Sequence, residues 1–218
     1  MKKLLIIATI LTCAAIAQAD LLIGFNFAGY AGSEVQGTST VFAAGMQNPA
    51  YLTRGAGLVP SANGNSMRSA NWASADVGAA ITANDYFTWT ISADSGNAFD
   101  ATNVVFNWSY SSTGPSTMSL RSSADGFASD LATFSSVVNG ATQSTALAIS
   151  GASTVEFRLY AYGNTATSGT AGFDASAAAG AGILEVYGTV AAIPEPVTMA
   201  FMGVGLAVFA LLRHRKNA

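Results

Sequence analysis

Apolar side chains in the middle of this chain recur at every second position. Phe87, Trp89 and Ile91, for example, alternate with polar residues. A period of two places successive side chains on opposite faces of an extended strand, so such segments are expected to be β-strands buried on one side. The same alternation, or an apolar run of strand length, recurs at residues 21–27, 104–110, 116–122, 144–149, 155–162 and 183–190.

Turn-forming residues separate the expected strands. Clusters of Gly, Asn, Asp and Ser stand at residues 93–97 and 138–140, and Gly114-Pro115 forms another break. No stretch between the two ends of the chain shows a helical period of 3.6. The pattern predicts an all-β fold, an antiparallel β-sandwich of jelly-roll type over residues 20–192, whose first and last strands pair side by side. Residues 28–80 carry weaker signals and are expected to form short strands and long loops.

The rare residues exclude much catalytic chemistry. The only histidine is His214 and the only cysteine is Cys13, so residues 20–193 contain neither type. Triads with histidine, Cys-His pairs, His/Cys zinc sites and disulfides cannot form within this region. Paired carboxylates remain available, but no spacing selects a pair among Glu34, Glu156, Glu185 and the aspartates. We therefore expect no enzymatic activity and no cofactor.

The distribution of charge argues against a nucleic-acid-binding protein. Residues 20–193 hold four arginines and no lysine against eleven acidic residues, a net charge of −7. Nucleic-acid binding depends on clustered Lys and Arg. Nucleic acid is therefore not an expected partner.

The N-terminus has the three parts of a secretory signal peptide. Lys2 and Lys3 precede an uncharged apolar run, and Ala17-Gln18-Ala19 forms a small-x-small cleavage site before Asp20. Signal peptidase is expected to remove residues 1–19. Two alternatives remain: a retained membrane anchor, and lipid attachment at Cys13.

The C-terminus also has three parts. Pro194-Glu195-Pro196 precedes a 16-residue uncharged run, residues 197–212, and the basic residues Arg213, Arg215 and Lys216 follow with His214 among them. An apolar run stopped by a basic cluster predicts one transmembrane helix, with the C-terminus in the cytoplasm and residues 20–193 outside. A buried core helix is the alternative.

These C-terminal features resemble the PEP-CTERM sorting signal of exported bacterial proteins. The match covers residues 193–218, with Pro194, Glu195 and Pro196 as the recognition element. The resemblance implies that an exosortase, a membrane protease and transpeptidase, cuts near the tripeptide. It also implies a route from an inner-membrane anchor to the cell surface or the extracellular space.

The body carries a second, softer resemblance. Leu120-Arg121-Ser122-Ser123, residues 125–131 and Val155-Glu156-Phe157-Arg158-Leu159-Tyr160 look like the bodies of many PEP-CTERM proteins. Those bodies are commonly interpreted as lectin-like β-sandwiches. The resemblance implies no catalytic residue.

Four residues are candidates for binding a glycan. Trp72 lies outside any expected strand beside polar neighbours, where its ring could stack on a sugar, although it could equally close one end of the sandwich. Arg158, Tyr160 and Tyr162 share one strand face with Glu156, and this face is either a binding surface or an ordinary solvated one. Trp89 and Trp108 alternate with apolar residues and are expected in the core.

Calcium is a weaker possibility. Asp94, Asn97 and Asp100 supply oxygen atoms within one turn-rich segment, and Asp125 and Asp130 within another. Asp and Asn are also the ordinary residues of turns, and the EF-hand pattern is absent. The sequence therefore predicts that these residues form turns and do not bind a metal ion.

Together these features predict an exported, non-enzymatic surface or matrix protein that is sorted through its C-terminal signal. The alternative is a glycan-binding module for exopolysaccharide. A polysaccharide hydrolase or lyase is the third hypothesis.

Overall fold

The computed structural model describes residues 19–72, 75–174 and 184–193 of the chain. These residues form thirteen strands, one α-helix and one short 3-10 turn, η1 (Ser123–Asp125). The other elements, in chain order, are β1 (Asp20–Phe25), β2 (Gly37–Phe42), β3 (Tyr51–Arg54), β4 (Val59–Pro60), β5 (Ser66–Ala70), α1 (Val77–Ala83), β6 (Tyr86–Ser92), β7 (Asn97–Tyr110), β8 (Thr117–Ser122), β9 (Ala132–Phe134), β10 (Thr142–Ala152), β11 (Thr154–Tyr162), β12 (Ala171–Asp174) and β13 (Leu184–Ala192).

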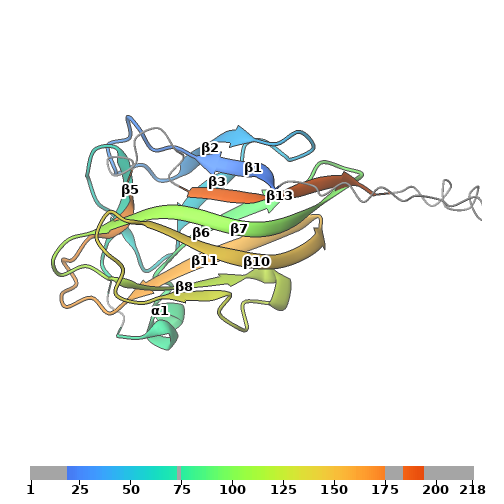
Figure 1. Ribbon diagram of the computed structural model, residues 1–218. Coiled ribbons are helices and arrows are strands. Elements are labelled where there is room, and N and C mark those ends of the chain that lie inside the picture. Colours follow the sequence, from blue (N-terminus) through green and yellow to red (C-terminus); the bar gives the residue numbers. More distant parts are fainter. Residues whose placement is uncertain (1–18, 73–74, 175–183, 194–218) are drawn as a thin grey trace, which may run out of the picture.

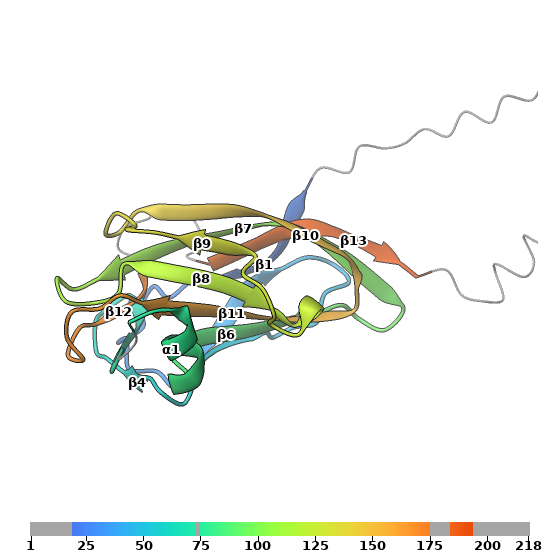
Figure 2. The same cartoon turned by 90° about the horizontal axis from the view of Figure 1, so that it is seen from below.

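The strands form two layers, and every pairing is antiparallel (Figures 1 and 2). The first layer has the order β2-β1-β13-β7-β10, and the second has the order β2-β3-β6-β11-β8-β9. Strand β2 joins them because its residues 39–42 pair with β1 while Gly37 and Thr38 pair with β3. The short strands β12, β5 and β4 extend the first layer beyond the end of β13. The all-β, antiparallel prediction is confirmed.

The core lies between the layers and is rich in aromatic rings. Phe173 of β12 lies 5.2 Å from Phe87 and 5.6 Å from Trp108 between ring centroids, and the three side chains are fully buried. Trp89 is 1% exposed and stacks on Phe157. The predicted core positions of Trp89 and Trp108 are therefore confirmed. Large aromatic side chains contribute heavily to such a core, which has no disulfide within the described residues.

Strand prediction from alternation was accurate for the long strands and missed the helix. β6, β7, β8, β10 and β11 lie at the expected positions, and residues 28–80 contain the short strands β2 to β5. Helix α1 has only seven residues, too few to show a period of 3.6. Its ends have recognisable caps: the Asp76 carboxylate accepts from the Ala79 amide at 2.8 Å, and Asn84 adopts the left-handed conformation with φ of 61°.

The two ends of the described fold lie at the same end of the sandwich (Figure 2). β1 begins at Asp20 and pairs with β13, as predicted for the first and last strands. β13 ends at Ala192, and the next amide, that of Ile193, donates to the carbonyl of Gly96 at 2.8 Å.

The predicted processing signals lie almost wholly outside the described residues. This applies to Ala17, to Pro194, Glu195 and Pro196, to the expected transmembrane helix at 197–212 and to the basic cluster of Arg213, Arg215 and Lys216. Among residues 19–72, 75–174 and 184–193, no helix has the length and apolar character needed to cross a membrane.

Candidate functional site

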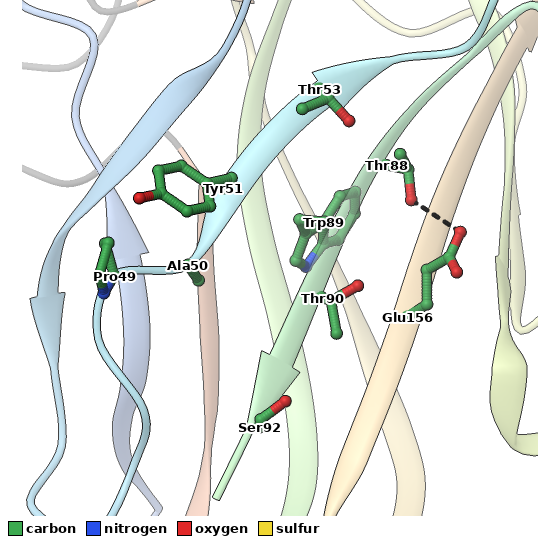
Figure 3. Close-up of a pocket in the computed structure, with 9 residues that line it drawn as sticks. All are labelled: Pro49, Ala50, Tyr51, Thr53, Thr88, Trp89, Thr90, Ser92 and Glu156. Carbon is green, nitrogen blue, oxygen red and sulfur yellow. Dashed lines mark hydrogen bonds between the residues drawn. The ribbon is translucent and has the colours of Figure 1, made fainter.

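An open groove of about 440 Å³ lies on the outer face of the second layer, over β3, β6 and β11 (Figure 3). Its lining combines hydroxyl groups with one exposed aromatic ring and one carboxylate. The residues that shape it are Pro49, Tyr51, Thr53, Thr88, Thr90 and Glu156.

Strand alternation places these side chains on the outer face. Phe87, Trp89 and Ile91 of β6 are buried, so the threonines between them, Thr88 and Thr90, face outward. The strand register then sets the neighbours. Thr53 of β3 is opposite Thr88, and Glu156 of β11 is opposite Thr90.

Glu156 is held by one of its two carboxylate oxygens. Oε1 accepts from Thr88 Oγ1 at 3.0 Å and from Arg158 Nε at 2.7 Å. The Glu156 amide donates to Ser123 Oγ at 2.9 Å, which fixes the backbone as well. Oε2 has no hydrogen-bond donor among the residues that the structure describes. The groove therefore presents a fixed acceptor with free lone pairs.

Tyr51 is the aromatic wall of the groove, across β6 from Glu156 (Figure 3). Its side chain is 44% exposed, unusually open for an aromatic residue on a central part of a sheet. The backbone beneath it is rigid, because Ser39 and Ala50 exchange two bonds: the Ser39 amide donates to the Ala50 carbonyl at 2.9 Å and the Ala50 amide to Ser39 Oγ at 3.0 Å. The preceding Asn48–Pro49 peptide bond is cis.

The face next to the groove looks similar in composition but is covered. We call Tyr86, Phe127, Arg158 and Tyr160 the covered patch. The Arg158 guanidinium lies 4.0 Å from the Phe127 ring centroid and 4.9 Å from that of Tyr86, and it also pairs with Glu156. The cation is thus flanked by two rings and a carboxylate of its own chain, and 28% of its side chain remains exposed.

Two of the predicted glycan-binding residues are not accessible. Tyr160 is only 2% exposed, and its ring meets Tyr86 edge-on at 5.1 Å. Helix α1 packs against the strand that carries it, β11 (Figure 2). Trp72 is fully buried among Phe87 and Trp108, with its indole N–H donating to the Ser69 carbonyl at 2.9 Å. The stacking role predicted for Trp72 is therefore wrong, and the alternative reading, a ring that closes the sandwich, fits its position.

The other two predicted residues are half-buried. Arg158 adjoins the groove only through its bond to Glu156. The Tyr162 hydroxyl lies 3.1 Å from Ser119 Oγ, which in turn donates to Asp130. The structure thus brings Arg158 to the edge of the groove and leaves Tyr162 outside it.

The weak calcium candidates have other partners. The Asp100 carboxylate accepts from the Gly151 amide at 2.7 Å and from Ser150 Oγ at 2.8 Å, and these bonds lower its pKa below the usual value. Asp94 is exposed, and its carbonyl accepts from the Asn97 amide as in an ordinary turn. Within the described ranges, no three His, Cys, Asp or Glu side chains are close enough to hold a metal ion.

Most of the groove was not predicted from the sequence. Tyr51 lies in the weak-signal region 28–80, and Thr53, Thr88 and Thr90 carry no motif. The one available signal was that Thr88 and Thr90 occupy the outward positions of a confidently alternating strand. Glu156 is expected on one face with Arg158 and Tyr160, and the structure shows that it lines the groove on that face.

The structure thus belongs to the class of antiparallel β-sandwich-like proteins and carries a hydroxyl-lined groove on its surface. No protein-family model, no curated protein and no solved structure matches this chain. The geometry is therefore the basis for any statement about function.

Proposed function

We propose that this chain is an exported, non-enzymatic surface or extracellular-matrix protein, sorted by an exosortase through its C-terminal PEP-CTERM signal. The supporting observation is where the sheet begins and ends. β1 starts at Asp20, the residue after the predicted signal-peptide site, and β13 ends at Ala192, two residues before Pro194. The two-layer antiparallel fold with paired first and last strands also supports the jelly-roll assignment.

Processing at both predicted sites is compatible with this fold. Removal of residues 1–19 takes nothing from β1, and a cut near residue 196 takes nothing from β13. Both strands keep all their partners, because the pairs of β13 with β7 end at Ala192 and Asn97. The proposal includes an inner-membrane intermediate, in which the predicted transmembrane segment at 197–212 holds the sandwich outside the cytoplasm.

The test is processing in a host that has an exosortase. The mature protein should begin at Asp20 by N-terminal sequencing and end near residue 196 by intact mass. Replacing Pro194-Glu195-Pro196 with alanines should leave the full tail attached and the protein in the membrane fraction. Alanines at Val197-Thr198-Met199 form the matched control and should be processed normally. If the tripeptide variant is processed as efficiently as the wild type, the sorting proposal is wrong.

A second candidate function, glycan binding, is favoured by the groove. Sugars present hydroxyl groups at their edges and C–H groups on their faces, and the groove offers hydroxyls, a fixed carboxylate oxygen and an exposed ring. Its lining has a single carboxylate, Glu156, whereas glycoside hydrolysis generally employs two across the scissile bond. We therefore propose binding without turnover.

A glycan array probed with the purified full chain in mild detergent tests this second function. Retention of at least one saccharide class by the wild type and its loss in Tyr51→Ala is the expected result. Release of reducing or unsaturated sugars from any bound polysaccharide would instead support the third hypothesis, a hydrolase or lyase.

A further inference from the structure

The charges around the groove bear on which saccharides it accepts. Glu156 is the only charged residue in the lining, and its Oε1 is paired with Arg158 at 2.7 Å. The pair leaves the groove close to electrically neutral, and the other carboxylate oxygen, Oε2, has no hydrogen-bond donor among the described residues. The groove lining contains no cation that could bind an anionic group, and Arg158 at its edge is already paired with Oε1 of Glu156.

None of the four arginines of the body lines the groove, and three of them are bonded within the protein. Arg158 lies in the covered patch, and Arg121 Nε pairs with Asp130 at 2.6 Å. Arg54 donates to the carbonyls of Gly32, Glu34 and Arg68, and burial lowers its pKa to about 10. Arg68 is half-buried near the carboxylate of Asp174. Carboxylate, sulfate and phosphate groups are bound in proteins chiefly by such cations, and here none lines the groove.

The unpaired hydroxyl groups in the groove lining favour ligands that are themselves rich in hydroxyl groups. Tyr51, Thr53 and Thr90 line the groove, and within the described part of the chain their hydroxyls have no hydrogen-bond partner. Each can donate one bond and accept others, and Glu156 Oε2 accepts only. This mixture complements sugar hydroxyls, which both donate and accept. A cationic ligand, which only donates, would leave the groove hydroxyl protons without acceptors.

We propose that the groove binds an uncharged polysaccharide and discriminates against acidic ones. One pyranose face stacks on Tyr51 beside Pro49, and hydroxyls of that sugar or its neighbour bond to Thr90 and to Glu156 Oε2. This inference rests on the glycan-binding function proposed above and specifies its ligand class.

Affinity electrophoresis of the full chain tests the inference. Native gels in mild detergent contain either a neutral polymer (hydroxyethylcellulose, laminarin, galactomannan or arabinoxylan) or an acidic one (alginate or polygalacturonate). We expect retardation by at least one neutral polymer and none by the acidic ones. Removal of the aromatic anchor in Tyr51→Ala should weaken that binding by about tenfold or more.

Matched variants locate the binding. Phe42 is an aromatic residue on β2, outside the groove lining, with nearly the same exposure as Tyr51, 43% against 44%, so Phe42→Ala should bind like the wild type. Glu156→Gln removes the charge and should weaken neutral binding, while Asp94→Asn is its control at an exposed turn. If Glu156→Gln fails to fold, Thr90→Val removes an exposed hydroxyl that has no partner in the described structure and should weaken binding in the same direction.

The outcomes separate the two proposals. Retardation by acidic polymers alone, or equally by both kinds, would overturn the neutral-ligand inference and leave glycan binding intact. Retardation by no polymer, together with an unresponsive glycan array, would reject both. Neutral binding that is lost in Phe42→Ala but kept in Tyr51→Ala would place the site elsewhere and would also overturn the inference.

Discussion

The groove and the covered patch lie on one face of the same layer, share the strands β6 and β11, and are built from similar kinds of residue. Each contains at least one tyrosine and one member of the Glu156–Arg158 ion pair. Tyr51 is 44% exposed, whereas Tyr160 is 2% exposed. The difference arises from elements outside the strands: α1 packs against β11, and Phe127 lies over Arg158, while nothing in the described structure covers Tyr51.

This comparison shows that a polar, aromatic strand face is not in itself a binding surface. Its availability depends on the segments that lie over it. In the covered patch the side chains contact one another, whereas in the groove the hydroxyls of Tyr51 and Thr90 have no hydrogen-bond partner among the described residues.

Tyrosine truncation should separate the two regions most strongly. Tyr160→Ala removes a buried ring that packs on Tyr86 and should lower the free energy of unfolding by about 3 kcal/mol. Tyr51→Ala should change it by less than about 0.5 kcal/mol, since the ring is largely exposed. Urea denaturation of both variants measures the difference. Equal losses would mean that Tyr51 is as tightly packed as Tyr160.

Truncation of the arginine in the covered patch should have an intermediate effect. Arg158→Ala removes contacts with two rings and the bond to Glu156, and we expect a loss of about 1–2 kcal/mol by urea denaturation. Arg158→Lys keeps the charge but not the planar group, so it should recover only part of the loss. Full recovery by lysine would show that charge alone, and not the contact with the rings, provides the stability.

Removal of the N-terminal cap should destabilise α1, the helix that packs against β11 beside the covered patch. Asp76→Ala deletes the side-chain acceptor of the Ala79 amide and should cost about 1 kcal/mol, with faster hydrogen exchange confined to α1. Asp94→Ala is the control, because that exposed carboxylate has no hydrogen-bond partner in the described structure. Unchanged exchange in α1 would mean that packing on β11, and not the cap, holds the helix.

The smallest effect should distinguish two threonines within the groove. Thr88 Oγ1 donates to Glu156 and lies 2.9 Å from the Phe157 carbonyl, so Thr88→Val should lower the free energy of unfolding by about 0.5–1 kcal/mol. Thr90 has an exposed side chain without such partners in the described residues, and Thr90→Val should be close to neutral. A loss at Thr90 as large as that at Thr88 would show that its hydroxyl is already in use.

The sequence predicted strands well because alternation is a local property. The phase of β6 and β11 follows directly from residues such as Trp89 and Phe157, whose burial the structure confirms. The segments that lie over the covered patch, α1 and the loop that carries Phe127, could not be predicted from alternation. Helix α1 is too short to show a period, and Phe127 reaches Arg158 from a backbone conformation with φ of 61°, which non-glycine residues rarely adopt.

The site was predictable only in part for the same reason. Glu156 and Arg158 were on the correct face, but the exposure of Tyr160 depended on a distant segment. Tyr51 lies in a four-residue strand whose position is fixed by pairing with β6, a contact that its own sequence does not indicate. For Trp72 the sequence leaves both interpretations open, because an aromatic residue in a loop has no alternation to reveal whether it points inward.

The position of β13 has a consequence for biogenesis. Strand β13, the last in the described residues, lies inside its layer between β7 and β1 and pairs residues that are far apart in the sequence, such as Asp20 and Gly188. A nascent chain appears N-terminus first, so β1 and β7 exist with unpaired edges until residue 192 has been synthesised. Open strand edges are templates for pairing with other chains. Completion of this layer therefore depends on the synthesis of β13: a chain that stops before β13 is prone to aggregation, whereas one cut after Ala192 keeps β13 paired with both β7 and β1.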